Sequence, residues 1–372
     1  MLTEQPKPSF RDAQGNVRSR PLRMLLVLGT FLVTILGFGW SYGVMRDPAA
    51  PRWLVTAIAL LIGVAGIWLL FWLANTAVGL LPGERLQERL RAWIFVGPAL
   101  GLLLVYLVYP TLHTIYLSFM DARGDNFVGL ENYAFAVTDK TMRSAFVNNV
   151  YWLVGVTVFS VVLGLVIAVL LDRVRYESFA KSLIFLPMVI SFVGASVIWK
   201  FIYAFQPPGR PQIGLLNAVV TGLGGEPVGW LIDRQFNTFA LIAIMIWLQT
   251  GFCMVILSAA LKAIPGEIMD AARIDGAGEV DIFFSIIIPA LKPTIITVAT
   301  TVLIAVLKVF DIVYVMTNGQ HNTEVIANRM YAEMFRFRNF GHGSALAVIL
   351  LIAVVPVMIA NVRAFRRQGR GQ

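Results

Sequence analysis

The chain is 372 residues long, and 58% of its residues are hydrophobic whereas only 14% are charged. With a mean hydropathy of +0.75, this composition excludes a soluble globular protein of that length and predicts a polytopic membrane protein. The formal net charge of +9 is typical of basic cytoplasmic loops, so we expect no nucleic-acid partner. The single cysteine, Cys253, lies in an apolar run, which excludes an intrachain disulfide and a CxxC metal site.

Taken in chain order, the sequence begins with a polar, basic stretch over 1–23 that predicts a disordered cytoplasmic lead. Each of the apolar runs that follow is near or above the roughly 20 residues that a helix needs to cross a bilayer. The runs lie at 24–45, 53–80, 93–119, 147–171, 182–205, 237–261, 289–317 and 344–362. The predicted fold class is therefore an all-α polytopic membrane protein with eight transmembrane helices.

The distribution of basic residues indicates the orientation of the chain. If the N-terminus is inside, the segments on the inner side hold most of the 30 Lys and Arg residues, as the positive-inside rule requires. Both termini are therefore predicted to be cytoplasmic, together with a basic tail over 366–372 and the segment 261–293. The outer connection 206–230 is rich in Pro and Gly, which predicts an irregular loop with a short helix at Leu215–Val220.

The segment 261–293 carries the densest polar pattern in the C-terminal half. Pro265 suits the first turn of a short helix, and Glu267 and Asp270 then lie near a helix N-terminus, which favours negative charge. Gly276 permits a sharp turn, after which an amphipathic run leads into the next apolar segment. This pattern predicts a bent helical knob between two membrane spans.

The same pattern resembles the EAA loop, which is the cytoplasmic coupling loop of bacterial ABC importer permeases. The positions that match are Asp270, Ala271, Ala272, Gly276, Ile286 and Pro289. Asp270 stands where the family usually has Glu, and Glu267 is placed to share its role. The resemblance implies an ATPase-coupling surface made of Glu267, Asp270, Ala271, Ala272, Asp275 and Gly276.

Other stretches look like landmarks of carbohydrate-importer permeases of the maltose-transporter (MalF-like) type. They are Phe127–Tyr133, Gly214–Asn217, Trp230-Leu231, Leu261–Pro265, Phe310-Asp311 and Met316–Gly319. The resemblance covers 93–365 and implies a six-helix permease core, to which 24–80 adds an N-terminal hairpin. The larger maltose-type permease has such a hairpin too, but it carries a large folded insertion where 120–146 here is a short loop. The implied substrate is therefore a disaccharide or oligosaccharide such as an α-glucoside, maltose or trehalose, without a choice among them.

The resemblance also implies the partners: a second permease, two cytoplasmic ATPase subunits and an extracytoplasmic sugar-binding protein. All would assemble at the cytoplasmic (inner) membrane of a bacterium. The chain has no G-x-x-x-x-G-K-[ST] motif, so we expect ATP and Mg on the partner ATPase and no cofactor on this chain. We therefore expect a transport subunit rather than an enzyme.

Polar side chains in the predicted spans are candidates for the substrate path, because a sugar site needs hydrogen-bonding groups beside aromatic ones. By the resemblance, parts of the fifth and sixth spans line this path. The candidates are Met188, Ser191, Trp247, Gln249, Thr250, Lys308 and Asp311. Plainer interpretations stay open: Gln249 and Thr250 as links between helices, Ser191 bonded to its own backbone, and Lys308 paired with Asp311 one helical turn away.

Two other functions stay open. An ion-coupled secondary transporter would use buried charges, and the pair Lys308 and Asp311 is its one support. A membrane-embedded enzyme would need acids or nucleophiles gathered at one depth, and the sequence has no such cluster. A metal site at His321 and His342 is not expected, because no Cys or carboxylate lies near them at metal-ligand spacing.

Overall fold

The computed structural model describes residues 20–368, with the exception of Leu80, Pro82 and Arg173. Every regular element in this part of the chain is helical, and its only β-type pairing is an isolated bridge between Met120 and Phe127. The predicted all-α class is confirmed. Of the lead predicted over 1–23, residues 1–19 lie outside the described part of the chain. Residues 20–23 belong to the first helix.

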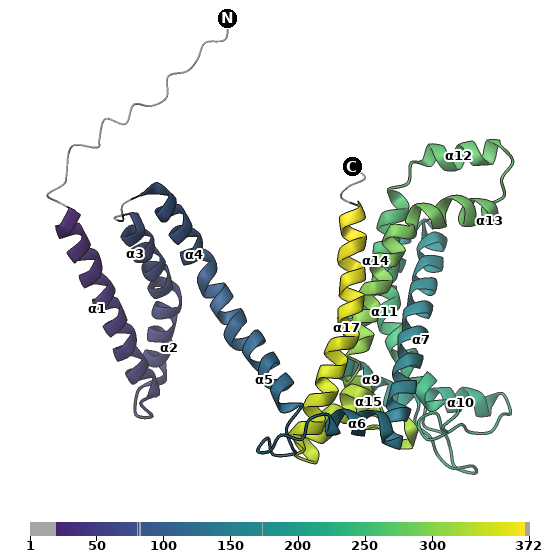
Figure 1. Cartoon of the computed structure of the whole chain (residues 1–372). Coiled ribbons are helices and arrows are strands. Elements are labelled where there is room, and N and C mark those ends of the chain that lie inside the picture. The colour runs from purple at the N-terminus through teal and green to yellow at the C-terminus, as the bar shows by residue number, and fades with distance from the viewer. Residues whose placement is uncertain (1–19, 80, 82, 173, 369–372) are drawn as a thin grey trace, which may run out of the picture. The chain divides into compact units, whose positions relative to one another are not determined.

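The chain divides into two compact units, Met1–Thr111 and Leu112–Gln372. In the first unit, two helices joined by a π-helical turn form one apolar stretch that packs on the helix before it (Figure 1). Gly66 allows this contact, since a Cβ there would lie 2.7 Å from the ring of Phe38. The helices are α1 (Arg20–Arg46), α2 (Arg52–Leu61), α3 (Ile67–Gly79) and α4 (Glu84–Leu103), and a second π-helical turn continues α4 into α5 (Tyr109–Leu117).

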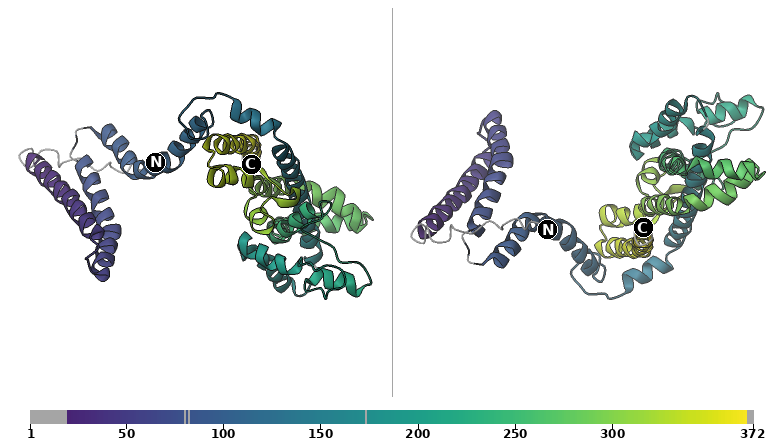
Figure 2. Two further views of the ribbon diagram at one scale, coloured as in Figure 1. Left: turned by 90° about the horizontal axis from the view of Figure 1, so that it is seen from below. Right: turned by 90° about the horizontal axis from the view of Figure 1, so that it is seen from above.

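The second unit is built around α7 (Lys140–Leu171) and α11 (Asn237–Lys262), which pack against each other along their lengths (Figures 1 and 2). Gly164 lets the two backbones approach closely, because a Cβ there would lie 2.5 Å from the Cβ of Cys253. α14 (Ile288–Leu307) contacts both helices, and α17 (Phe340–Gln368) contacts α14.

Shorter helices complete the second unit. Asp139 caps the start of α7, where its side chain accepts a hydrogen bond from the Met142 N–H at 3.0 Å. The short outer helix predicted at Leu215–Val220 is confirmed as α10. The elements are α6 (Glu131–Thr138), α8 (Glu177–Phe185), α9 (Phe192–Ile202), α10 (Leu215–Gly222), α12 (Gly266–Ile274), α13 (Glu279–Ile282), α15 (Asp311–Met316) and α16 (Ile326–Tyr331).

The number of membrane spans differs from the prediction of eight. Among the described residues, six helical stretches are long and apolar enough to cross a membrane, and a bent pair makes a seventh if it counts as one span. The six are Arg52–Gly79, Glu84–Leu117, Lys140–Leu171, Asn237–Lys262, Glu279–Leu307 and Phe340–Ile359. The structure therefore supports a polytopic all-α membrane protein, but not the exact number of eight spans.

The predicted fifth span over 182–205 is not one straight helix. Glu177–Val189 and Phe192–Ile202 meet at an angle of 101°. Ile190 between them is extended, with a ψ of 135°, and Ser191 caps the second half by accepting a hydrogen bond from the Gly194 N–H at 3.1 Å. A hydrophobicity count cannot detect this bend, because the run 182–205 is apolar on both sides of Ile190.

The predicted seventh span over 289–317 is interrupted. α14 ends at Leu307, and Phe310, with φ −140° and ψ −60°, stands outside helical geometry before α15 begins. The ring of Phe310 packs against Tyr314 and Tyr331, with centroid distances of 5.1 and 5.2 Å. Because Tyr331 belongs to α16, the break is held by a tertiary contact rather than by a local helix breaker.

Candidate functional site

The segment 261–293 forms the bent helical knob that the sequence predicts. The sequence analysis placed Pro265 in the first turn of this helix. In the structure α12 begins at Gly266, so Pro265 is instead the capping residue just before it. Gly276 has a φ of +85°, a left-handed value that favours glycine. The Ala277 N–H then donates to the Ala272 carbonyl at 2.9 Å and closes the helix end.

Charges on the knob pair with one another across the turn. Arg273 donates to Asp270 Oδ1 at 2.8 Å and to Glu279 Oε1 at 3.0 Å. The hydrogen bond and charge of the Glu279 carboxylate, and to a lesser extent those of Asp270, raise the pKa of the Arg273 guanidinium. Glu267 and Asp275 are exposed at the two ends of α12. Asp270 is thus held by a neighbour, whereas Glu267 forms no ion pair among the described residues.

An exposed apolar stripe runs along α12 between these charges. Ile268, Ala271 and Ile274 follow at three-residue spacing and are exposed, and Ile274 is 87% exposed. Met269 and Ala272, on the opposite side, pack against the core of the unit. Sequence reasoning missed Ile268 and Ile274, although their i, i+3, i+6 spacing with Ala271 carries the signal.

Near the knob, an ion cluster joins α8 to α11. The Glu177 carboxylate binds the Lys181 ammonium on its own helix and the Lys262 ammonium, at 2.7 Å, from the end of α11. Lys181 also bonds the hydroxyl of the buried Ser258. Sequence analysis missed this cluster, because its members lie about 80 positions apart.

Four of the predicted substrate-path residues line one cavity of about 430 Å³ in the second unit. They are Met188, Ser191, Gln249 and Asp311. The wall also contains Ile190, Phe192, Val193 and Leu248, which the sequence analysis did not select. The bend between α8 and α9 and the break before α15 bring these residues together, so the two departures from straight spans shape the cavity.

Two other predicted residues do not line this cavity. Trp247 packs edge-on against Trp199, with ring centroids 5.8 Å apart. The hydroxyl of buried Thr250 donates to the Ile246 carbonyl of its own helix at 2.7 Å. Gln249, between them, forms no hydrogen bond with another described residue and is half-buried.

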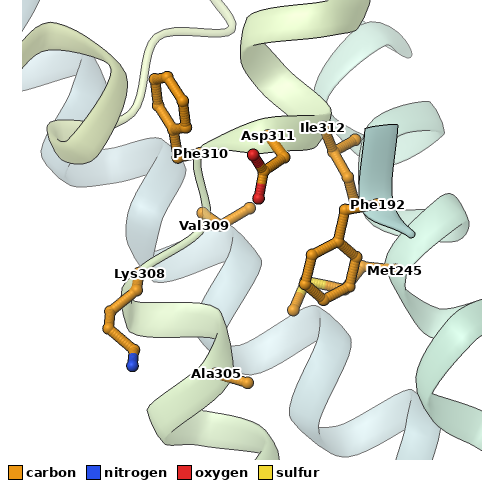
Figure 3. A pocket seen from close by; sticks show the side chains of 8 residues that line it. All are labelled: Phe192, Met245, Ala305, Lys308, Val309, Phe310, Asp311 and Ile312. Atoms are coloured by element: carbon orange, nitrogen blue, oxygen red, sulfur yellow. The ribbon is translucent and has the colours of Figure 1, made fainter. Parts of the chain in front are cut away.

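Lys308 and Asp311 do not lie one helical turn apart as predicted, because the helix ends between them. They border a small recess of about 20 Å³ together with Phe310 and five other residues (Figure 3). Figure 3 shows the Lys308 ammonium directed away from the Asp311 carboxylate. In the described part of the chain no ion pair joins the two groups.

A buried polar network ties α7 to the loop after α15. The amide of Asn148 donates to the carbonyls of Asn322, at 2.7 Å, and Glu324, at 2.9 Å. The Asn149 side-chain oxygen accepts from the Ile326 N–H at 2.9 Å. Burial raises the pKa of the Glu324 carboxyl. Sequence analysis did not single out these residues, since their partners lie more than 170 positions away.

Comparison with known proteins places this architecture in a family. The family described as "binding-protein-dependent transport system inner membrane component" matches residues 160–368, more than half of the chain. The chain belongs to this family. Its resemblance to ABC importer permeases of the carbohydrate type, predicted from the sequence, is thereby confirmed, and the protein is a transport subunit of the membrane.

Two relatives of this permease are especially similar in sequence. The osmoprotective compounds uptake permease protein GgtC of Synechocystis sp. is 64% identical over 275 residues, which cover 74% of this chain and 99% of GgtC. The alpha-glucoside transport system permease protein AglF of Rhizobium meliloti is 51% identical over 288 residues, covering 77% of this chain and 86% of AglF.

A solved structure shares the fold at lower sequence identity. It belongs to a bacterial ABC transporter involved in the import of the acidic polysaccharide alginate. The TM-score is 0.65 at 20% identity, and the match covers 76% of this chain and 99% of the other. At that identity the likeness establishes the importer permease fold and says nothing about the substrate.

Proposed function

We propose that this permease forms half of the translocation path of an ATP-driven importer for a disaccharide or oligosaccharide, such as an α-glucoside, maltose or trehalose. The observation that carries this proposal is the cavity of about 430 Å³ with Ser191, Gln249 and Asp311 on an otherwise apolar wall. Its size and its few polar groups fit a small-molecule site. The name of the relative AglF, an alpha-glucoside permease, supports the substrate class.

The proposed assembly contains a second permease, two cytoplasmic ATPase subunits that hold ATP and Mg, and an extracytoplasmic sugar-binding protein. The second permease supplies the opposite wall of the path. The family description, a binding-protein-dependent transport system, supports the external binding protein. The assembly is located in the bacterial inner membrane.

The proposed topology keeps eight crossings and two cytoplasmic termini. The first crossing is α1, whose bounds Arg20–Arg46 include the predicted run 24–45. The fifth is the bent pair α8 and α9, and the seventh is α14 extended by α15. The hairpin 24–80 then precedes a six-helix core over 93–365, and the tail 366–372 ends in the cytoplasm.

In this assembly α12 is the docking element for the ATPase. The stripe Ile268, Ala271 and Ile274 would enter an apolar groove of the ATPase, while Glu267 and Asp270 meet basic groups at its rim. Closure of the ATPases on ATP would displace α12 as a rigid body. Because Met269 and Ala272 pack on the core, that displacement reaches α11 and α14 and switches the path between its two faces.

The experiment that tests coupling removes both carboxylates in the purified complex. In E267Q/D270N we expect sugar uptake to fall at least about tenfold, because two charge-assisted contacts are lost, while ATP hydrolysis no longer responds to the sugar-loaded binding protein. The single change Asp270→Asn should reduce sugar uptake less than the double change does, since Arg273 keeps Glu279 as a partner.

The matched control is D125N/E226Q, which removes two exposed carboxylates on loops away from α12. It should leave uptake and coupled hydrolysis unchanged. Normal coupling in E267Q/D270N would contradict the docking role of α12. Gradient-driven uptake by this chain alone, with no ATPase recovered from its native membrane, would contradict the importer and favour the ion-coupled alternative.

A further inference from the structure

The cavity in the second unit carries one ionisable group. Its lining contains five apolar side chains, Met188 among them, together with Ser191, Gln249 and Asp311. The Ser191 oxygen already accepts a hydrogen bond from the Gly194 N–H at 3.1 Å, which leaves its O–H to donate. The side chains of Gln249 and Asp311 form no hydrogen bond with another described residue. The wall therefore offers one hydroxyl donor, one amide and one carboxylate to a ligand.

The charge of Asp311 is not neutralised by the nearest cation along the chain. The helix ends between Lys308 and Asp311, and the ammonium points away from the carboxylate (Figure 3). Lys308 borders the small recess and an apolar groove beside α16 and α17, but it does not line the cavity of about 430 Å³. Within the described residues, that cavity is thus a site of uncompensated negative charge.

A fixed carboxylate in such a cavity discriminates by charge. A carboxylate accepts hydrogen bonds only, and hydroxyl groups of a neutral glycoside can each donate one to it. A ligand carboxylate at the same place cannot donate and is repelled, all the more because the surrounding wall is apolar and has a low dielectric constant. The Gln249 amide, which both donates and accepts, adds orientation without charge.

We propose that Asp311 determines substrate specificity by accepting hydrogen bonds from the hydroxyl groups of neutral glycosides and by excluding saccharides that carry a carboxylate. The proposal rests on the sugar-import function proposed above and adds to it a residue and a chemical class of substrate. It requires that the charge itself matters, and not only the presence of a polar group at this position.

The test compares two ligands that differ in one carboxylate, 4-nitrophenyl α-glucoside and 4-nitrophenyl α-glucuronide. Dissociation constants are measured for each on the purified full transporter complex in detergent, without the binding protein, so that its selectivity does not enter. In the wild type we expect the glucoside to bind at least about tenfold more tightly than the glucuronide.

In D311N we expect glucoside binding to weaken about tenfold and the ratio of the two constants to approach one, since an amide neither repels an anion nor accepts as strongly. In D311E the charge stays and the preference for the glucoside should persist. Co-purification of the partner chains establishes that each variant is assembled, and D125N, on an exposed outer loop, is the control that should keep the wild-type ratio.

An unchanged ratio in D311N, with glucoside still bound, would overturn the role of Asp311 and leave the import function standing. Equal loss of preference in D311E and D311N would also overturn it, because shape rather than charge would then decide. Failure of the wild-type complex to bind or transport any neutral glycoside would instead overturn the proposed substrate class.

Discussion

Two stretches of this permease have similar hydropathy but different surroundings within the chain. Arg52–Gly79 has a mean hydropathy of 2.6 in its most apolar window, and no residue of that window other than Gly66 is buried. Asn237–Lys262 has a value of 2.3, and 61% of its window is buried. Hydropathy therefore indicates only that a helix is compatible with lipid. Whether that helix packs against other helices depends on features that hydropathy does not measure.

The difference in burial arises from glycines at the contacts between helices. α11 meets α7 at Gly164 and α8 at Gly251, where an added Cβ would lie 2.6 Å from the Ile184 carbonyl oxygen. In α4, by contrast, an added Cβ at Gly97 or Gly101 would meet nothing within 4 Å. Glycine is thus a packing requirement at the contacts of α11 and neutral at these two positions of α4.

The largest effect is expected from Gly164→Leu. The new side chain would collide with the backbone of α11, because its Cβ alone would lie 2.8 Å from the Met254 nitrogen. We expect a loss of about 3 kcal/mol in the free energy of unfolding, at the upper end for an overpacked core. The measurement is the temperature at which the purified protein loses its monodisperse peak in detergent.

The control for this change is Gly101→Leu in α4, another helix long and apolar enough to cross a membrane. It should leave the transition temperature unchanged, because it has no neighbour to displace. Equal sensitivity at both glycines would erase the distinction between the two regions.

A smaller effect is expected from Asn148→Ala. The change removes two hydrogen bonds and leaves the buried Glu324 carbonyl and the part-buried Asn322 carbonyl without that donor. We expect a loss of about 2 kcal/mol, the usual cost of such orphaned groups. Thermal unfolding in detergent measures it, with Asn75→Ala in α3 as the comparison, since Asn75 forms no hydrogen bond with another described residue. A neutral Asn148→Ala would mean that water replaces the lost donor.

The smallest effect is expected from deleting the hairpin 24–80. The alignment with GgtC covers 99% of that relative but only 74% of this chain, so about a quarter of this chain has no counterpart there. We expect the shortened protein to recover its partner chains and to retain uptake. Removing the two crossings proposed for 24–80 keeps the orientation of the remaining ones. Loss of a partner in pull-down would show that the hairpin belongs to the assembly surface.

Much of the candidate site could be predicted from the sequence, because its information is local. The order Asp270, Ala271, Ala272 and Gly276 identified the knob, and the turn at Gly276 needs only the φ of that residue. Of the substrate-path residues, Met188, Ser191, Gln249 and Asp311 were predicted and lie at one cavity. The exposed stripe on α12 is equally local, since Ile268, Ala271 and Ile274 lie within seven consecutive residues.

The sequence by itself determined the class of protein, the family, the approximate helices and the bent helical knob at 261–293. Hydropathy, basic residues and a contiguous motif are all properties of neighbouring positions. Only the tertiary structure decided that the fifth span bends at Ile190, that the seventh breaks before Asp311, and that Lys308 and Asp311 point apart. These features depend on contacts between residues far apart in the chain, such as Phe310 with Tyr331, whose packing energy no single stretch of sequence contains.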